Sequence, residues 1–387
     1  MSLAIRLWPW LAVLLALAVV LLYRPGAEPV RDLATPETAQ QALGGVLGGD
    51  AGEFARAIEP REFRFPDDHG PHPAYRNEWW YVTAHLHDPE GQRVTLMLTF
   101  FRFGLSPEPE SNDWRSSQVY MAHFALLDQA SDRHLHGERL QRAALGLAGA
   151  ERAPYRVWLQ DWSLVGQMDD LFPATLQLKH DSVDISLSLQ PAKPPVLQGE
   201  QGLSQKSAEP GNASYYYAYT RLHAEGQITL DGQSRQLTGQ AWMDREFGSS
   251  ALAEDQIGWD WFSLQLSNGH ELMIYQMRRA DGSIDPYSHG AWIDAEGNKQ
   301  HLPAGSYQVD TLDYWQAADG RARYPARWRI QLQQPELNIE LAPLRDDQEM
   351  RNTRFRYYEG AIDGQGQMSG QAIKVQGFVE MTGHAEQ

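Results

Sequence analysis

The 387-residue chain contains no cysteine, which excludes disulfides, thiolate metal ligands, cysteine nucleophiles and lipid attachment at cysteine. It is also poor in positive charge, with 33 Lys and Arg against 50 Asp and Glu and a formal net charge of −17. Because phosphate binding needs clustered Lys and Arg, this balance argues against a nucleic-acid partner. The absence of cysteine is also compatible with an oxidising compartment, where stray thiols are a liability.

Several catalytic signatures are missing as well. The chain shows no βαβ rhythm, no Gly-rich phosphate loop, no HExxH and no Gly-x-Ser-x-Gly nucleophile elbow. Ser249 and Ser250 follow an acidic cluster at residues 244–246, but nothing marks them as nucleophiles. The stretch His69-Gly70-Pro71-His72-Pro73 is open to two interpretations, a metal site or an extended loop, and its Pro and Gly favour the loop. We expect no cofactor and no metal.

One long hydrophobic run occurs, from Leu7 to Tyr23, with Arg6 before it and Arg24 after it. At about 1.5 Å per residue, its length is near the lower limit for spanning a bilayer. A small-x-small cleavage pattern is missing, which favours an uncleaved signal anchor over a removed signal peptide for residues 1–24. Residues 25–60, rich in Ala, Gly, Pro, Glu and Gln, predict a linker. The folded body is then expected beyond the inner membrane, in the periplasm.

The rest of the sequence predicts β-structure. Strand-length runs of alternating apolar residues are separated by Gly, Asn, Asp and Pro, which is typical of antiparallel meanders that close into barrels or pack as sandwiches. Residues 191–213 are rich in Pro, Gly, Gln and Ser and predict an inter-domain linker or a long loop. We therefore expect one barrel over residues 61–213 and a second over residues 214–387.

A tryptophan-rich strand occurs twice, and each copy leads through a polar turn into a second apolar strand. The copies cover residues 77–86 and 258–266, which suggests a duplicated hairpin. The alignment matches Trp79 with Trp259, Tyr81 with Trp261, Thr83 with Ser263, and Trp80 with Asp260. With 13 Trp and 16 Tyr in the chain, such rings can fill a barrel or line an apolar ligand pocket.

Acidic residues beside these aromatic ones are the candidate catalytic groups. In the strand that ends at Gly248, period two puts Trp242 and Asp244 on one face and Arg245 on the other. Asp244 and Glu246 either belong to an ion-paired strand end or provide a carboxylic acid whose pKa is raised by burial, so that it can donate a proton.

Asp260 is the second candidate acid. It shares a face with Phe262 and Leu264, opposite Trp259 and Trp261. This carboxyl either satisfies a buried partner, such as Arg245, or acts as a general acid, so we place the expected chemistry in the second barrel. His85 and His123, by contrast, are expected to be structural, because a metal site needs several converging ligands.

Three motifs resemble those of the AttH-like family. They are the run from Phe65 to Tyr81, the segment Trp242-Met243-Asp244-Arg245-Glu246-Phe247-Gly248 with Gly258-Trp259-Asp260-Trp261, and the closing Gly377-Phe378-Val379-Glu380-Met381-Thr382-Gly383. The family is labelled as predicted secreted hydrolases, is related to carotenoid 1,2-hydratases, and often accompanies an ABC transporter of the lipoprotein-release type. The resemblance implies an all-β fold of two lipocalin-like antiparallel β-barrel domains.

The hydratase relatives add water to a terminal carbon–carbon double bond of an apolar polyene. Transferred by motif, Asp260 or Asp244 is the acid, and Trp242, Trp259 and Trp261 stabilise the cation. The hydratases have a His-containing version of the segment that here reads Met243-Asp244-Arg245. The "hydrolase" label finds no nucleophile or metal site in this sequence.

Two functions remain open from the sequence. The first is a membrane-tethered periplasmic protein that binds an apolar or lipid-like ligand and is associated with an ABC transporter permease. The second is a hydratase or hydrolase with Asp260, Asp244 and Glu246 as acid and base groups. The candidate ligand-binding residues are Trp79, Tyr81, Trp242, Arg245, Trp259 and Trp261.

Overall fold

A computed structural model describes residues 52–107, 116–167, 169–250 and 252–385. The predicted membrane anchor and most of the predicted linker lie outside these residues. Within the described ranges, no helix is long and apolar enough to cross a membrane. The first barrel is preceded by a short 3-10 helix, η2 (Asp67–His69).

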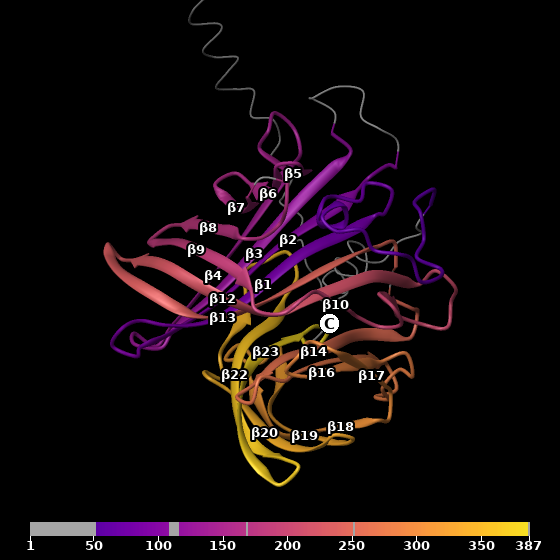
Figure 1. Cartoon of the computed structure of the whole chain (residues 1–387), viewed down its shortest axis with the longest axis vertical. Helices are drawn as coiled ribbons and strands as arrows, with labels where there is room; N and C mark the ends of the chain where they lie inside the picture. The colour runs from indigo at the N-terminus through magenta and orange to yellow at the C-terminus, as the bar shows by residue number, and fades with distance from the viewer. Residues whose placement is uncertain (1–51, 108–115, 168, 251, 386–387) are drawn as a thin grey trace, which may run out of the picture.

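The strands form two antiparallel sheets (Figure 1). In order of pairing, the main path of the 13-stranded first sheet is β4 (Arg133–Arg142), β3 (Gln118–Asp128), β2 (Arg93–Gly104), β1 (Asn77–His87), β13 (Gln233–Gly248), β12 (Ala213–Leu230), β9 (Val183–Pro191), β8 (Ala174–His180), β7 (Trp162–Gly166), β6 (Tyr155–Leu159) and β5 (Ala148–Arg152). Two short strands, β10 (Val196–Leu197) and β11 (Leu203–Gln205), pair with β12 outside this path.

The second sheet has ten strands and curls almost into a ring, drawn in orange to yellow in Figure 1. Its main path is β17 (Lys299–Pro303), β16 (His289–Ile293), β15 (Glu271–Arg279), β14 (Gln256–Leu266), β23 (Gln371–Met381), β22 (Tyr357–Met368), β20 (Glu336–Pro343), β19 (Arg323–Gln333) and β18 (Tyr307–Gln316). The short β21 (Glu349–Met350) pairs with β22. The expected all-β architecture of two barrel-like units is therefore confirmed.

The sheets divide the chain at a different place from the sequence prediction. Strands β12 and β13 pair with β9 and β1 inside the first sheet, so the division falls between Gly248 and Gln256 rather than at residue 213/214. The Pro- and Gly-rich stretch 191–213 is a long loop that carries β10 and β11 back onto β12. The connection between the sheets is the short segment between β13 and β14, and β13 itself belongs to the first barrel.

Burial along the strands shows where the sheets meet. In β9 and β20 buried and more exposed residues alternate, as expected for strands with one face on a barrel core and one in water. In β1, β2 and β14, and in the second half of β13 (residues 241–248), nearly every residue is buried. Besides one apolar core inside each barrel, a third cluster that includes Tyr81, Trp242 and Trp261 lies between the sheets.

Both repeated hairpins are present as β1–β2 and β14–β15. Tyr81 and Trp261, at matching positions of the repeat, meet edge to face with ring centroids 5.3 Å apart. Polar contacts fix the interface as well: buried Glu271 on β15 accepts hydrogen bonds from Arg221 Nε at 2.6 Å and from Lys193 Nζ at 2.8 Å, both in the first half of the fold. The duplicated strands thus face one another across the sheet–sheet interface.

Candidate active site

A cavity of about 120 Å³ lies between the two sheets. The residues that line it come from both copies of the repeat and from neighbouring strands. Its aromatic walls include Trp79, Tyr81, Phe101, Phe103, Tyr216, Trp259, Trp261, Tyr275, Phe355 and Tyr357. Alternation on β1 and β14 turns the odd-numbered residues of the repeat toward this space, whereas Trp80 points into the first barrel core.

Asp244 is the buried acid of this cavity. Its Oδ1 accepts a hydrogen bond from the Tyr216 hydroxyl at 2.6 Å, and its Oδ2 accepts one from Trp242 Nε1 at 2.7 Å. Burial raises the pKa of Asp244 well above its usual range, against the effect of these hydrogen bonds, and the charges of Glu246 and Glu380 act in the same direction as burial. This shift favours the neutral carboxyl, which is the form that can donate a proton.

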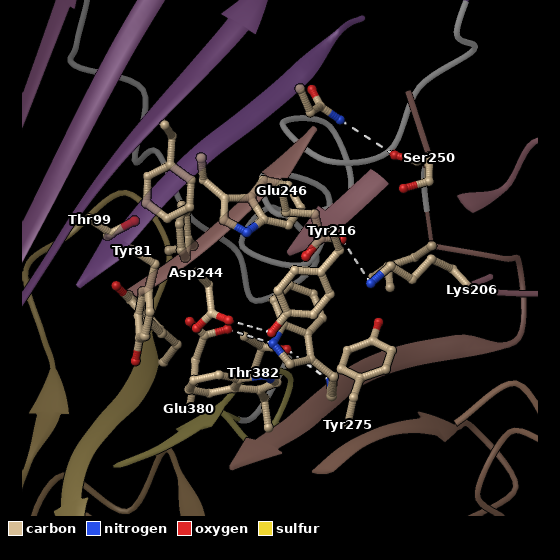
Figure 2. Close-up of a pocket in the computed structure, with 18 of the residues that line it drawn as sticks. Tyr81, Thr99, Lys206, Tyr216, Asp244, Glu246, Ser250, Tyr275, Glu380 and Thr382 are labelled. Atoms are coloured by element: carbon tan, nitrogen blue, oxygen red, sulfur yellow. Dashed lines mark hydrogen bonds and ion pairs between the residues drawn. The ribbon is translucent and has the colours of Figure 1, made fainter. Parts of the chain in front are cut away.

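Two glutamates face Asp244 from the second sheet. Glu380 on β23 lines the cavity and accepts a hydrogen bond from Trp259 Nε1 at 2.5 Å, while its cross-strand neighbour Glu359 accepts one from the Tyr81 hydroxyl at 2.9 Å. Burial raises the pKa of both carboxyls, and the charge of Glu380 raises that of Glu359 further. Figure 2 shows Asp244 and Glu380 pointing toward the same part of the pocket.

Glu246 and Lys206 form an ion pair at another part of the wall (Figure 2). Lys206 Nζ lies 2.9 Å from Glu246 Oε1, and the Ser214 hydroxyl donates to the same oxygen. The Lys206 ammonium also lies 4.3 Å from the centre of the Tyr275 ring. Glu246 therefore lines the cavity as an ionised partner of Lys206, in agreement with the ion-paired interpretation of this residue.

Asp260 lies outside the residues that line the cavity and points to the core side of the second barrel. Its Oδ1 accepts hydrogen bonds from His384 Nε2 at 2.7 Å and from Arg278 Nε at 3.1 Å. Burial alone would raise its pKa, but the charges of His384 and Arg278 hold that pKa below its usual value. The structure thus gives Asp260 ionic partners other than the expected Arg245, and its side chain does not line the cavity.

Arg245 also lies away from the cavity, on the opposite face of β13 as the alternation predicts. It is fully buried, lies over the Trp80 ring at 4.0 Å, and donates hydrogen bonds to Glu78 and to Gly70 O. Burial would raise the pKa of Glu78, but the charges of Arg245 and Arg102 hold it well below its usual range. Arg245 therefore fastens the loop before β1 to the first barrel.

The predicted site residues thus separate into two groups. Asp244, Glu246, Trp79, Tyr81, Trp259 and Trp261 line one cavity, and Trp242 supports Asp244 through its indole N–H. Asp260 and Arg245 lie elsewhere. Sequence reasoning missed Tyr216, Lys206 and Glu359, and it quoted Glu380 only within a family motif. A run of tyrosines at 215–217 was the available signal for Tyr216.

The histidines form no metal site among the described residues, where no group of three or more potential ligands occurs. His-x-His pairs do exist, at His85/His87 and His134/His136, but without further converging ligands. His123 is fully buried and joins the Tyr357 hydroxyl, at 2.8 Å, to Glu138, at 3.0 Å.

Paired lipocalin-like barrels with a cavity between them define the class of protein. A family model described as AttH-like matches residues 56–384, and the chain belongs to this family. The structure of a candidate AttH from Nitrosomonas europaea is 32% identical, with a TM-score of 0.77 over 86% of this chain and 100% of that one. No curated protein sequence matches the chain.

Two more distant structures share the fold. Kievitone hydratase from Nectria haematococca has a TM-score of 0.65 at 14% identity, over 86% of this chain and 97% of its own. CghA has a TM-score of 0.53 at 12% identity, over 88% of this chain and 98% of its own. At such identities the likeness shows the fold alone.

Proposed function

We propose that this chain is a hydratase-type enzyme that acts on an apolar alkene by carboxylic-acid catalysis. The observation that carries the proposal is Asp244, a buried carboxyl held by Tyr216 and Trp242 at the wall of an aromatic cavity. Protonating an alkene requires an acid that is still protonated near neutral pH, and burial favours that form of Asp244 by raising its pKa.

The cavity walls support the second part of the reaction. Protonation of a carbon–carbon double bond leaves a carbocation, which the electron-rich faces of Trp79, Trp259 and Trp261 would stabilise. Water then adds to the cation and loses a proton to the carboxylate of Asp244, directly or through Tyr216. This proton restores the acid, so the cycle balances without net proton uptake.

The relatives support this reaction class more than any one substrate. Kievitone hydratase shares the fold and is named as a hydratase. A carotenoid is not required as substrate, because Met243-Asp244-Arg245 stands where the carotenoid hydratases have a His-containing segment. A hydrolase activity has less support, since Ser249 donates its hydroxyl hydrogen bond to Ala55 O and no base contacts it.

The test is isotope incorporation. The full chain is incubated with prenyl and polyene alkenes in H₂¹⁸O and, separately, in D₂O, and the products are analysed by mass spectrometry. We expect one ¹⁸O and one carbon-bound deuterium per product, with both lost in Asp244→Asn. Absence of label from the whole panel, with protein shown to be folded, would refute the proposal.

A second candidate function is binding without turnover. The cavity is lined mostly by aromatic side chains, as is common for sites that hold apolar small molecules. Native mass spectrometry of protein purified from membranes would show a retained apolar or lipid-like ligand in that case. An empty cavity in every preparation would argue against a carrier role.

Location and partner are proposed from the sequence alone. The apolar run at residues 7–23 supports a periplasmic protein tethered to the inner membrane. The family resemblance supports association with an ABC transporter permease. Membrane fractionation, and co-purification with an ABC transporter permease, would test the two points separately.

A further inference from the structure

The charges around the cavity are strongly one-sided. Asp244, Glu246 and Glu380 line it, and Glu359 lies directly behind Tyr81. Among the described residues that line the cavity, Lys206 is the one Lys or Arg, and it is already paired with Glu246. Asp244, Glu359 and Glu380 make no ion pair with a Lys, Arg or His of the described chain.

The three carboxyls without a cationic partner are not merely buried against each other. Asp244 and Glu380 border open space of the cavity, and Glu359 Oε1 is a buried oxygen to which no N–H or O–H donates in the described residues. Indole and phenol donors hold their other oxygens, namely Trp242, Trp259, Tyr81 and Tyr216. The arrangement fixes the carboxyls in place without giving them a cationic partner.

The aromatic side chains of the cavity wall also favour a positively charged ligand. The faces of aromatic rings attract cations, most strongly when the cation is removed from water. Trp79, Trp259, Trp261 and Phe101 supply such rings around the carboxyls. A cation placed here can form ion pairs with these carboxyls once they ionise, whereas an anion finds no cationic partner beside them in the described part of the chain and its charge is buried at a cost.

We propose that the cavity selects an apolar molecule bearing a positive charge, such as an alkyl ammonium, over the corresponding carboxylate or phosphate. The inference rests on the proposed function for the site and deepens it. The natural substrate is a neutral apolar molecule that becomes cationic during the reaction, and a stable ammonium with the same tail imitates that state. Fatty acids and phosphorylated lipids should accordingly bind more weakly than the corresponding ammonium.

Binding of a cation should release protons. Burial favours the neutral forms of Asp244 and Glu359, and a positive charge beside them favours their ionised forms. Affinity for the cation should therefore rise with pH until the carboxyls ionise without it. A neutral ligand with the same tail should show no such dependence.

The experiment compares three probes of one tail length below their micelle concentrations: trimethyloctylammonium, 1-octanol and octanoate. Isothermal titration calorimetry uses the full chain in phosphatidylcholine nanodiscs, with empty nanodiscs as blank, in two buffers of different ionisation enthalpy. We expect the ammonium to bind at least tenfold more tightly than octanoate, and more tightly than octanol, with proton release. In the double variant Glu359→Gln/Glu380→Gln, the ratio of the affinity for the ammonium to the affinity for octanoate should fall about tenfold.

The exposed Glu340→Gln is the matched control and should keep the full preference. Equal or tighter binding of octanoate, binding of none of the probes, or an ammonium preference that survives in the double variant would overturn the inference. The proposed function can fail independently of this inference. A cation preference without ¹⁸O incorporation would support a cation-selective binding site and refute the hydratase. Incorporation of ¹⁸O without a cation preference would support the hydratase and refute cation selectivity.

Discussion

The hydroxyl of Tyr216 lies 2.6 Å from Oδ1 of Asp244 and joins β12 to β13 at the wall of the cavity between the two sheets. When Asp244 is neutral, its O–H can donate to Tyr216, which can donate onward to a bound molecule. When Asp244 is ionised, Tyr216 donates back to it. This contact can therefore carry a proton in either direction, and the first two predictions concern it.

Replacing Asp244 with Asn should abolish turnover while preserving the fold. General acid catalysis contributes about 10²- to 10⁴-fold, so a loss of that size is expected in the rate of ¹⁸O incorporation. Because the folded protein raises the pKa of Asp244, the stability contributed by this carboxyl is present at low pH and declines as pH rises. As pH rises above the unfolded pKa of about 4, the variant should lose less thermal stability than wild type. Undiminished turnover would contradict the role of Asp244.

Replacing Tyr216 with Phe removes one hydroxyl and keeps the ring. If the proton passes through Tyr216, turnover should fall by about 10²-fold or more, and the pH–rate profile should shift because Asp244 loses one of its two hydrogen-bond donors. Tyr275→Phe changes another tyrosine of the cavity wall and is the control. An unchanged rate and pH profile in Tyr216→Phe would show that Asp244 acts without it.

Asp260→Asn is expected to have the opposite effect to Asp244→Asn. The change breaks the pairing with Arg278 and His384 and leaves both cations half-buried without their carboxylate. Removing one partner of such a pair costs roughly 3–5 kcal/mol, measured as the free energy of unfolding in urea. Turnover per folded molecule should stay within about twofold of wild type. Asp313→Asn, at an exposed ion pair, should cost less than about 1 kcal/mol.

Buried histidines should make the fold sensitive to mild acid. His85 donates from Nε2 to Gly377 O at 2.9 Å, and burial lowers its pKa to about 4. Its stabilising contribution is present above the unfolded pKa of about 6.5 and is lost as pH falls toward 4. Between pH 7 and pH 5 this should cost about 2 kcal/mol of unfolding free energy.

His85→Gln keeps a hydrogen-bond donor that does not titrate, so its stability should fall less steeply over this pH range. The exposed His223→Gln serves as control and should follow the wild-type slope. Parallel slopes for wild type and His85→Gln would show that protonation of His85 is not coupled to unfolding.

Local patterns in the sequence were sufficient for the strands and for the direction of their side chains. Period-two alternation placed Trp242 and Asp244 on one face of β13 and Arg245 on the other, and it put Asp260 opposite Trp259 and Trp261. The repeat correctly paired Tyr81 with Trp261. These features depend only on backbone geometry along one strand, which the sequence specifies directly.

Which acid meets the cavity was decided by the tertiary structure. Asp244 and Asp260 both have aromatic neighbours in the sequence. In the folded protein Asp244 has no cationic partner among the described residues, whereas Asp260 pairs with Arg278 and His384, which are 18 and 124 residues away. Glu359 and Tyr81 are 278 residues apart and join only where the sheets pack. The charge state of a carboxyl depends on its burial and on partners that come from distant strands. The sequence by itself therefore determined which side chains share a face of each strand. Packing of the two sheets determined which of these faces holds the acid of the cavity.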